Sequence, residues 1–494
     1  MPWASPPAQP SELPNWIRAY LSPRDGLPAH RAHLFTINGY TYPFVRDFNF
    51  ACVPDPPETS HWMSRRRFSM LAGLFGTRPG DLMFFFQGDP QFPKDDIESR
   101  RGFRGIYRVV SSPFRDTTMI THPQTGYQIH GECPSCHKPF ATLGEECKLC
   151  GRAYPEIQVR AVYRRGPSGA MGSFRVHVLS ARMLTEPVAV FARTLGDNRG
   201  YMDMRDPGLI WISRADNAMG AGKGSSIRHI LPEEAIKLTR LLFSEPEQEI
   251  ISPQSSPYPS QSRETIRNDD GTESIYPRLL EDRRTLQHEL HLNLHIARTI
   301  DMAGALIQEA LGDALIASQM EYWGSELPWG YTADTADFVC TLRDGGSRYR
   351  LLIFEFKRDD IDDNALVEVM LYSYWVPQIC TQFAEPPVTE VEVVPVLIGR
   401  RNTLTRLPQD FEFPAKYLVG PPKTIRVLSP RVLEYSPTEV FQNPSSGRHY
   451  ARDLHYIDVT EQIGRIEWKP PEGVATTSVE REWVEGLWNR RAYG

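Results

Sequence analysis

Two nearly continuous apolar runs, YRLLIFEFK (349–357) and VEVVPVLIGR (391–400), constrain the fold of this chain more than any other feature. Runs of this length and composition are typical of strands that are buried on both faces. The segment between them, NALVEVMLYSYWV (364–376), has the character of a helix. Together with the strand candidate FVCTL (338–342), this order predicts a mixed sheet with helices on its faces.

A Ser- and Pro-rich segment, 245–278, predicts a linker between two parts of the chain. The first part, 1–244, has short strand candidates separated by Gly and Pro turns, which indicate a small β-barrel-like sheet with a few helices. The second part is expected over 279–430, and a tail or subdomain over 431–494. The expected fold class is therefore α+β with several domains, which agrees with a length that suits about three domains.

The second part opens with two helix candidates. Apolar residues recur at helical spacing in EDRRTLQHELHLNLHIART (281–299), and a second helix is expected over about 301–318. Together with the later helix, they would flank the mixed sheet.

The composition suits a folded chain and excludes other classes of protein. Apolar residues make up 40% and charged residues 23% of the chain, as in globular rather than disordered proteins. No apolar run of about 18 residues is present to span a bilayer, and MPWASPPAQP lacks the pattern of a signal peptide. Seven cysteines, four of them clustered, favour a reducing compartment and one metal site. We therefore expect a cytoplasmic protein with no membrane partner, whose net charge of −6 leaves nucleic-acid contact to local basic patches.

Two carboxylates and a lysine stand at the edge of the expected sheet. Asp337 begins one strand and Glu355 ends the next, so a hairpin would put them side by side. Two carboxylates and a main-chain carbonyl form a hard oxygen site that suits Mg²⁺ or Mn²⁺. Lys357 projects to the same side as Glu355, where it can position a water or neutralise a phosphate. The alternative stays open that Glu-x-Lys arises by chance and that Asp337 is a turn residue.

The stretches TADFVCTL, LLIFEFK and RDDIDDNALVEVMLYSYW, in this order, resemble the catalytic half of the PD-(D/E)XK nuclease superfamily, and look closest to its NucS-like branch. The resemblance implies a restriction-endonuclease-like α/β domain with a mixed sheet. It also implies that Asp337, Glu355 and Lys357 form the core of a Mg²⁺- or Mn²⁺-dependent site that hydrolyses DNA.

The same resemblance implies further site residues on two helices. The helix after the lysine has Glu368 where the related pattern has Gln, with Tyr372 four residues later on the same face. Glu368 is expected to hydrogen-bond DNA or to hold the metal site. Families of this type also place a Glu on the first helix, for which Glu289 is the choice and Glu281 and Glu309 are the alternatives.

A cysteine motif with the spacing CxxC-x10-CxxC predicts a zinc site within 131–156. Two such pairs supply four thiolates to one tetrahedral Zn²⁺ and leave no position for a reactive water, so a structural ion is expected. Its ligands would be Cys133, Cys136, Cys147 and Cys150. Contact with nucleic acid is the alternative role of this zinc ribbon, and a rigid insert is the favoured one.

Two stretches of the first part, 78–114 and 207–242, resemble the EVE and YTH group of PUA-like domains. The first has a Gly-Asp turn before a strand, followed by GIYRVVSS. Such domains accept a flipped or single-stranded modified base in an aromatic pocket, so the resemblance implies a nucleic-acid reader with the zinc ribbon inserted. A base pocket needs aromatic faces and cations. The candidates are Trp62, Arg65, Arg66, Arg67, Trp211 and Asn217, although each tryptophan has a core position as its alternative. The segment GAGKGSS (220–226) is interpreted as a flexible basic loop that contacts the nucleic-acid backbone through Lys223 and Arg228, with an ordinary surface turn as the alternative.

These features predict a metal-dependent DNA endonuclease whose reader senses a modified or unusual base, as in restriction or anti-phage defence. Two alternatives stay open: a catalytically inactive nucleic-acid-binding sensor or scaffold, and a nuclease that cleaves RNA. A homo-oligomer is expected, because nucleases with one site often pair to cut both strands.

Overall fold

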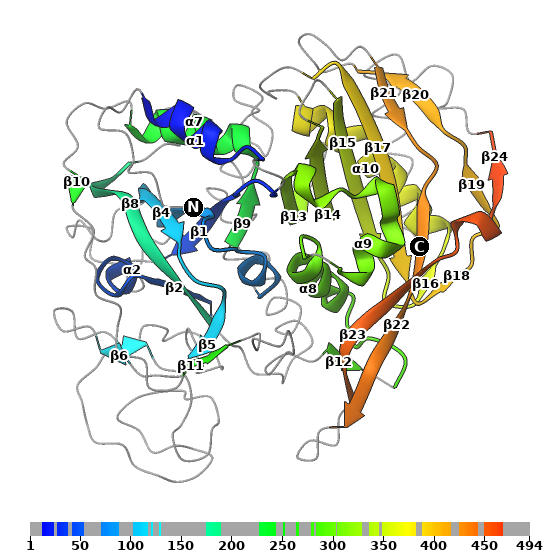
Figure 1. Ribbon diagram of the computed structural model, residues 1–494, viewed down its shortest axis with the longest axis horizontal. Coiled ribbons are helices and arrows are strands. Elements are labelled where there is room, and N and C mark those ends of the chain that lie inside the picture. Colours follow the sequence, from blue (N-terminus) through cyan, green and yellow to red (C-terminus); the bar gives the residue numbers. More distant parts are fainter. Residues whose placement is uncertain are drawn as a thin grey trace, which may run out of the picture.

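The fold is α+β, with two mixed sheets that lie side by side (Figure 1). The computed structural model describes residues 12–23, 27–37, 42–53, 71–87, 102–116, 120–121, 128–129, 174–188, 227–243, 250–251, 263–265, 278–280, 283–302, 304–328, 335–344, 348–381, 388–415, 424–442 and 449–467. Among these residues, no helix is long and apolar enough to cross a membrane.

The first sheet is curled like a half-barrel, in the strand order β11-β5-β8-β4-β3-β1-β9, with β2 and β10 also paired to β8. β1 and β3 are parallel, and the other printed pairs of this sheet are antiparallel. Its strands are β1 (Ala32–Ile37), β2 (Phe50–Val53), β3 (Leu82–Gln87), β4 (Gly102–Val109), β5 (Phe114–Asp116), β8 (Phe174–Val188), β9 (Ile227–Ile230), β10 (Ile250–Ile251) and β11 (Arg263–Thr265). The helices beside it are α1 (Leu13–Tyr20), α2 (Tyr42–Phe48) and α7 (Pro232–Phe243), and a small hairpin joins β6 (Ile120–Thr121) to β7 (Gln128–Ile129).

The second sheet has the order β12-β23-β22-β17-β15-β14-β13, with β21 and β20 branching from β17. The central strands β15, β17 and β22 run parallel, and antiparallel pairs flank them. Its strands are β12 (Arg278–Leu280), β13 (Met320–Pro328), β14 (Thr335–Arg343), β15 (Arg348–Phe356), β17 (Glu390–Gly399), β20 (Phe411–Pro414), β21 (Thr424–Val427), β22 (Arg431–Gln442) and β23 (His449–Asp458). Two small sheets join β16 (Asp360–Ile361) to β18 (Arg401–Asn402) and β19 (Arg406–Pro408) to β24 (Gly464–Ile466).

Helices cover both faces of this sheet because side chains on a strand alternate between its faces. Leu351 and Ile353 of β15 pack in one core cluster with α10 (Asp363–Thr381). Leu352 and Phe354 point the other way and pack with α8 (Leu290–Thr299) and α9 (Leu306–Leu311). The Asp362 side chain accepts a hydrogen bond from the Ala365 N–H at 3.0 Å and so caps the start of α10.

Four expectations about the elements need correction. The helix expected over 281–299 begins only at Leu290, and the one expected over about 301–318 is the six-residue α9 followed by two short 3₁₀ turns. Gly304 and Gly312, with φ of 75° and 53°, adopt left-handed backbone conformations that bound α9 on both sides. The expected linker 245–278 contributes β10 and β11 to the first sheet. The sheet also continues past residue 430, since β22 pairs with β17 and β23 with β22.

The two sheets meet through a tight junction between β9 and β13. The Tyr322 hydroxyl donates to the His229 carbonyl at 3.3 Å, and Arg228 forms an ion pair with Glu326 at 2.6 Å. A Cβ atom added at Gly324 would lie 2.6 Å from the Tyr322 hydroxyl and 2.7 Å from the His229 Cβ. Glycine is therefore required there for the two strands to approach this closely.

We predict that Gly324→Ala lowers the unfolding free energy by about 1–3 kcal/mol, the usual cost of overpacking a buried contact. Urea unfolding followed by fluorescence would measure it. Gly464→Ala is the control, because its added Cβ would meet its nearest atom, the Thr405 carbonyl oxygen, at 3.2 Å on an exposed strand; its effect should stay below about 0.5 kcal/mol. Equal stability of Gly324→Ala and wild type would show that the junction is looser than described.

Candidate active site

Asp337 and Glu355 lie next to each other at one edge of the second sheet. The antiparallel register pairs Phe338 of β14 with Phe354 of β15, so Asp337 and Glu355 are the next residues along the two strands. The Asp337 Oδ2 accepts a hydrogen bond from the Phe356 N–H at 2.7 Å, which ties the two strand ends together. The Glu355 carboxylate is buried, with 3% of its surface exposed, and Asp337 is half-buried.

Lys357 joins these strand ends to α10. Its Nζ lies 2.5 Å from Glu355 Oε1 and 2.8 Å from Glu368 Oε2. Glu355 is on the same face of β15 as Leu351 and Ile353, the face that α10 covers. Glu368, which stands where the related pattern has Gln, is thus the second carboxylate that accepts a hydrogen bond from Lys357.

The N-terminus of α8 brings a third carboxylate to the site. Glu289 is the N-cap residue of α8 and repels the charges of Asp337 and Glu355. One turn further on, Asn293 donates from Nδ2 to the Asp337 carbonyl at 3.1 Å and accepts from the Ser325 hydroxyl at 2.5 Å. Asn293 and Ser325 were not among the residues expected from the sequence. A polar residue within an apolar helical stretch was the one available signal for Asn293.

Negatively charged groups outnumber positively charged ones at the site. Burial, followed by repulsion from Glu289, raises the pKa of Asp337 to about 7, against the lowering effects of the Phe356 N–H, Lys357 and a side-chain hydrogen bond with Glu355. Burial and then Asp337 raise the pKa of Glu355 well above its usual range. Burial lowers the pKa of Lys357, but the attraction of Glu355, Glu289 and Asp337 outweighs it, so the net shift is upward. One ammonium group does not neutralise these carboxylates, and they retain a proton near neutral pH.

One observation indicates that these residues suit a divalent cation. Glu355 Oε2 is buried and has no hydrogen-bond partner. A second carboxylate, that of Asp337, lies beside it. Among the described residues, no three His, Cys, Asp or Glu side chains already stand as a metal-binding group. Mg²⁺ is commonly held by one or two carboxylates, with water and substrate phosphate as its other ligands. Asp337 and Glu355 are the two carboxylates suited to this role.

Several expected residues lie elsewhere. Glu309 is exposed on α9, and Tyr372 is 5% exposed in the core that contains α10. Arg228 lies in strand β9 rather than in a basic loop, and its guanidinium pairs with Glu326 across the junction. The other expected residues lie outside the described part of the chain: Glu281, Trp62, Arg65, Arg66, Arg67, Trp211, Asn217, Lys223 and the zinc ligands Cys133, Cys136, Cys147 and Cys150.

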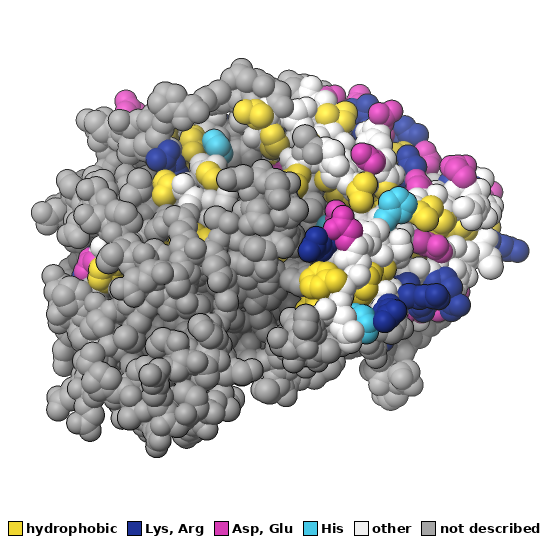
Figure 2. Space-filling view, turned by 60° about the horizontal axis from the view of Figure 1, so that its bottom comes forward, with side chains coloured by type: hydrophobic (Ala, Val, Ile, Leu, Met, Phe, Trp, Pro, Cys, Tyr) yellow, Lys and Arg dark blue, Asp and Glu magenta, His cyan; other side chains and the backbone are white. Residues whose placement is uncertain are grey.

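Three arginines beside the site were also missed. Arg358 follows Lys357, and Arg400 and Arg401 follow the neighbouring parallel strand β17, so all three lie at the same edge of the sheet. Their side chains are 39%, 37% and 63% exposed and pair with Asp359 or Asp360. In the space-filling view, acidic and basic side chains intermix on the described surface, and basic side chains gather in one group near its right-hand side (Figure 2). The two arginines directly after the buried run VEVVPVLIG were the sequence signal for Arg400 and Arg401.

Comparisons with known proteins leave the family undecided. No protein-family model matches this chain, and a search among curated proteins found no match. The resemblances to PD-(D/E)XK nucleases and to PUA-like domains therefore stay predictions, and the functional conclusion depends on the geometry of the site.

The raised pKa of Asp337 predicts how stability depends on pH. Between about pH 4 and 7 the unfolded chain releases the Asp337 proton while the folded protein keeps it, so the unfolding free energy falls as pH rises. Asp337→Asn removes this loss, because an amide stays neutral and still accepts from the Phe356 N–H. We therefore compare the unfolding free energy of the variant with that of wild type at each pH. This difference should favour the variant more at pH 8 than at pH 5, by about 1 kcal/mol or more.

Urea unfolding of both proteins at the two pH values, with EDTA present, would measure this difference. Asp313→Asn is the control, because Asp313 is exposed in a 3₁₀ turn and should change stability equally at both values. If the unfolding free energies of wild type and Asp337→Asn changed with pH in parallel, the pKa of Asp337 would not be raised in the folded protein.

Proposed function

We propose that this protein is a metal-dependent nuclease that hydrolyses DNA phosphodiester bonds at the edge of its second sheet. The observation that carries the proposal is the paired, proton-retaining carboxylates Asp337 and Glu355 beside Lys357, with Glu355 Oε2 lacking a partner. A buried acidic pair of this kind costs stability, and such groups cluster at functional sites. A bound Mg²⁺ would offset that cost, lower the pKa of a coordinated water and stabilise charge on the phosphate.

The residues of the chain have distinct roles in this proposal. Asp337 and Glu355 would hold the cation, and the Phe356 N–H, which donates to Asp337 Oδ2, would fix the orientation of that carboxylate. Glu368 holds the Lys357 ammonium at the site, where that ammonium can orient the attacking water or neutralise a phosphate oxygen. Proton retention near pH 7 makes cation binding compete with protons, so activity should rise with pH through neutrality.

The arginines beside the site supply a contact for the nucleic-acid backbone. Arg358, Arg400 and Arg401 pair with partly exposed aspartates, and ion pairs at the surface contribute little stability. A phosphate can therefore replace the aspartates at small cost, and such contacts position a nucleic acid without reading its sequence. In this proposal the amino-terminal part reads a modified or unusual base. The proposed setting of restriction or anti-phage defence rests on the resemblance to nucleases alone.

The second candidate is a catalytically inactive sensor or scaffold that binds nucleic acid. The contacts of Lys357 with both Glu355 and Glu368 favour it, because they form an ion network that needs no substrate. Such a network would have a structural role only, and binding of nucleic acid would then occur without cleavage.

We predict that Lys357→Ala reduces plasmid nicking in Mg²⁺ by about a hundredfold or more, the usual effect of removing a charge-stabilising group. Glu355→Gln should do the same through loss of cation binding. Glu309→Gln, an exposed carboxylate on α9, is the matched control and should cut like wild type. Equal nicking by wild type and Lys357→Ala would remove the catalytic assignment. The same comparison on matched RNA decides between the two polymers.

We further propose that the amino-terminal part binds one structural Zn²⁺ through Cys133, Cys136, Cys147 and Cys150. Purified protein should contain about one zinc per chain, a value set by four thiolate ligands on one ion. Elemental analysis of the wild type would measure it, and Cys147→Ser should lose most of the metal. Cys340→Ser is the control, because Cys340 is a buried thiol of β14. Equal zinc content in all three proteins would contradict the site.

A further inference from the structure

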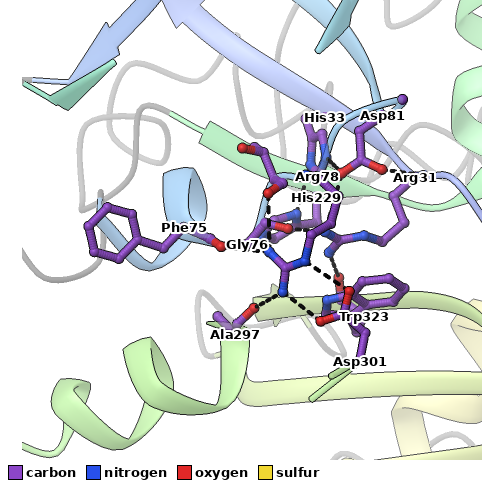
Figure 3. Close-up of polar contacts among 12 residues, drawn as sticks. Arg31, His33, Phe75, Gly76, Arg78, Asp81, His229, Ala297, Asp301 and Trp323 are labelled. Carbon is purple, nitrogen blue, oxygen red and sulfur yellow. Dashed lines mark hydrogen bonds and ion pairs between the residues drawn. The ribbon is translucent and has the colours of Figure 1, made fainter. Parts of the chain in front are cut away.

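Arg78 connects the amino-terminal part to the helix that borders the candidate active site. It lies in the loop before β3, and its guanidinium reaches the far end of α8 across the junction (Figure 3). Nη2 donates to the carbonyls of Ala297 and Arg298, both at 3.0 Å, in the last turn of α8. Carbonyls at a helix C-terminus have no partner within the helix, so a cation that donates to them fixes that end.

Asp301, just after α8, holds the same guanidinium from a second direction. Arg78 Nε and Nη2 donate to its two carboxylate oxygens at 2.8 and 2.6 Å. This two-point contact sets the orientation of the guanidinium as well as its distance. With 24% of the Arg78 side chain and 12% of the Asp301 side chain exposed, the pair is also partly shielded from water.

The other end of Arg78 is anchored in the first sheet. Its main-chain N–H donates to Asp81 Oδ2 at 2.9 Å, and Asp81 is 1% exposed. The same carboxylate holds His33 at 2.6 Å and Arg31, whose guanidinium lies 3.5 Å from the centre of the Trp323 ring on β13. Arg78 therefore projects from a rigid, buried network rather than from an adaptable loop (Figure 3).

The N-terminal end of α8 contacts the site itself. Glu289 precedes its first residue, and Asn293 holds the Asp337 carbonyl. A helix of ten residues is about 15 Å long and stiff, so a shift at one end moves the other. The position of Glu289 and Asn293 thus depends on what holds Ala297 and Arg298.

We propose that Arg78 is a positioning residue of the active site: from the amino-terminal part, it anchors the C-terminus of α8 and so sets where Glu289 and Asn293 stand beside Asp337. The inference rests on the proposed function and adds a route by which the amino-terminal part affects cleavage. Lysine cannot replace arginine here, because an ammonium lacks the planar fork that contacts Asp301 and two carbonyls together.

The test compares full-length wild type with Arg78→Lys, which keeps the charge and loses the fork. Mn²⁺ affinity by calorimetry should fall about tenfold, the typical effect of losing a group that orients metal ligands. Hydrogen exchange measured by mass spectrometry should become faster both in α8 and in residues 335–339 around Asp337. Arg350→Lys is the matched control: Arg350 also pairs with a carboxylate, Glu392, donates to the Asp313 carbonyl and is 23% exposed. It should leave both measurements unchanged.

Each outcome decides the role of Arg78. Faster exchange confined to α8, with residues 335–339 and Mn²⁺ affinity unchanged, would make Arg78 a merely structural contact and overturn the proposal. Unchanged exchange in both segments would overturn it as well. If wild type bound no Mn²⁺, the proposed function would fail by itself, and faster exchange in both segments would still support the positioning of this edge of the sheet by Arg78.

Discussion

The buried Asp81 carboxylate holds the junction between the two sheets together, and its surroundings show what a fully compensated charge requires. Burial by itself would raise its pKa, but Arg31 and His33 reverse that effect and hold the pKa below its usual value. The Arg31 and Arg78 N–H groups also donate to it. Asp81 is ionised and bonded on several sides, so it ties β1, β3 and the loop before β3 into one unit.

Asp337 and Glu355 are in the opposite situation. Burial raises their pKa values, and the single ammonium of Lys357 does not reverse the shift. The same chain therefore pays the cost of burying acidic groups twice, once with compensating cations and once without. An uncompensated acidic pair at a sheet edge is poorly suited to stabilising a fold and well suited to receiving a cation together with a phosphate.

Much of the site could be predicted from local sequence because neighbouring strands have few ways to pair. Only four residues separate β14 from β15, and their antiparallel pairing puts Asp337 beside Glu355, while the two-residue period of a strand puts Lys357 on the α10 side. Glu289 was expected near the site only because the resemblance to nucleases implies a glutamate on the first helix. By contrast, Arg228 was expected in a basic loop. Its ion pair with Glu326, which is 98 residues away, could not be predicted from the local sequence. The length of α9 was missed because glycines can continue a helix or end it, and tertiary packing decides which.

The sequence by itself determined the alternation of buried strands and helices and the order of acidic and basic groups at the ends of those strands. It did so because hydrophobic periodicity and hairpin geometry act over short distances along the chain. Only the tertiary structure decided that Arg78 reaches α8, that Glu289 lies close enough to Asp337 to raise its pKa, and that Glu355 Oε2 is left without a partner. The burial of a side chain and the charges around it depend on groups that come from distant parts of the chain. A linear sequence does not specify how far apart those groups lie in space.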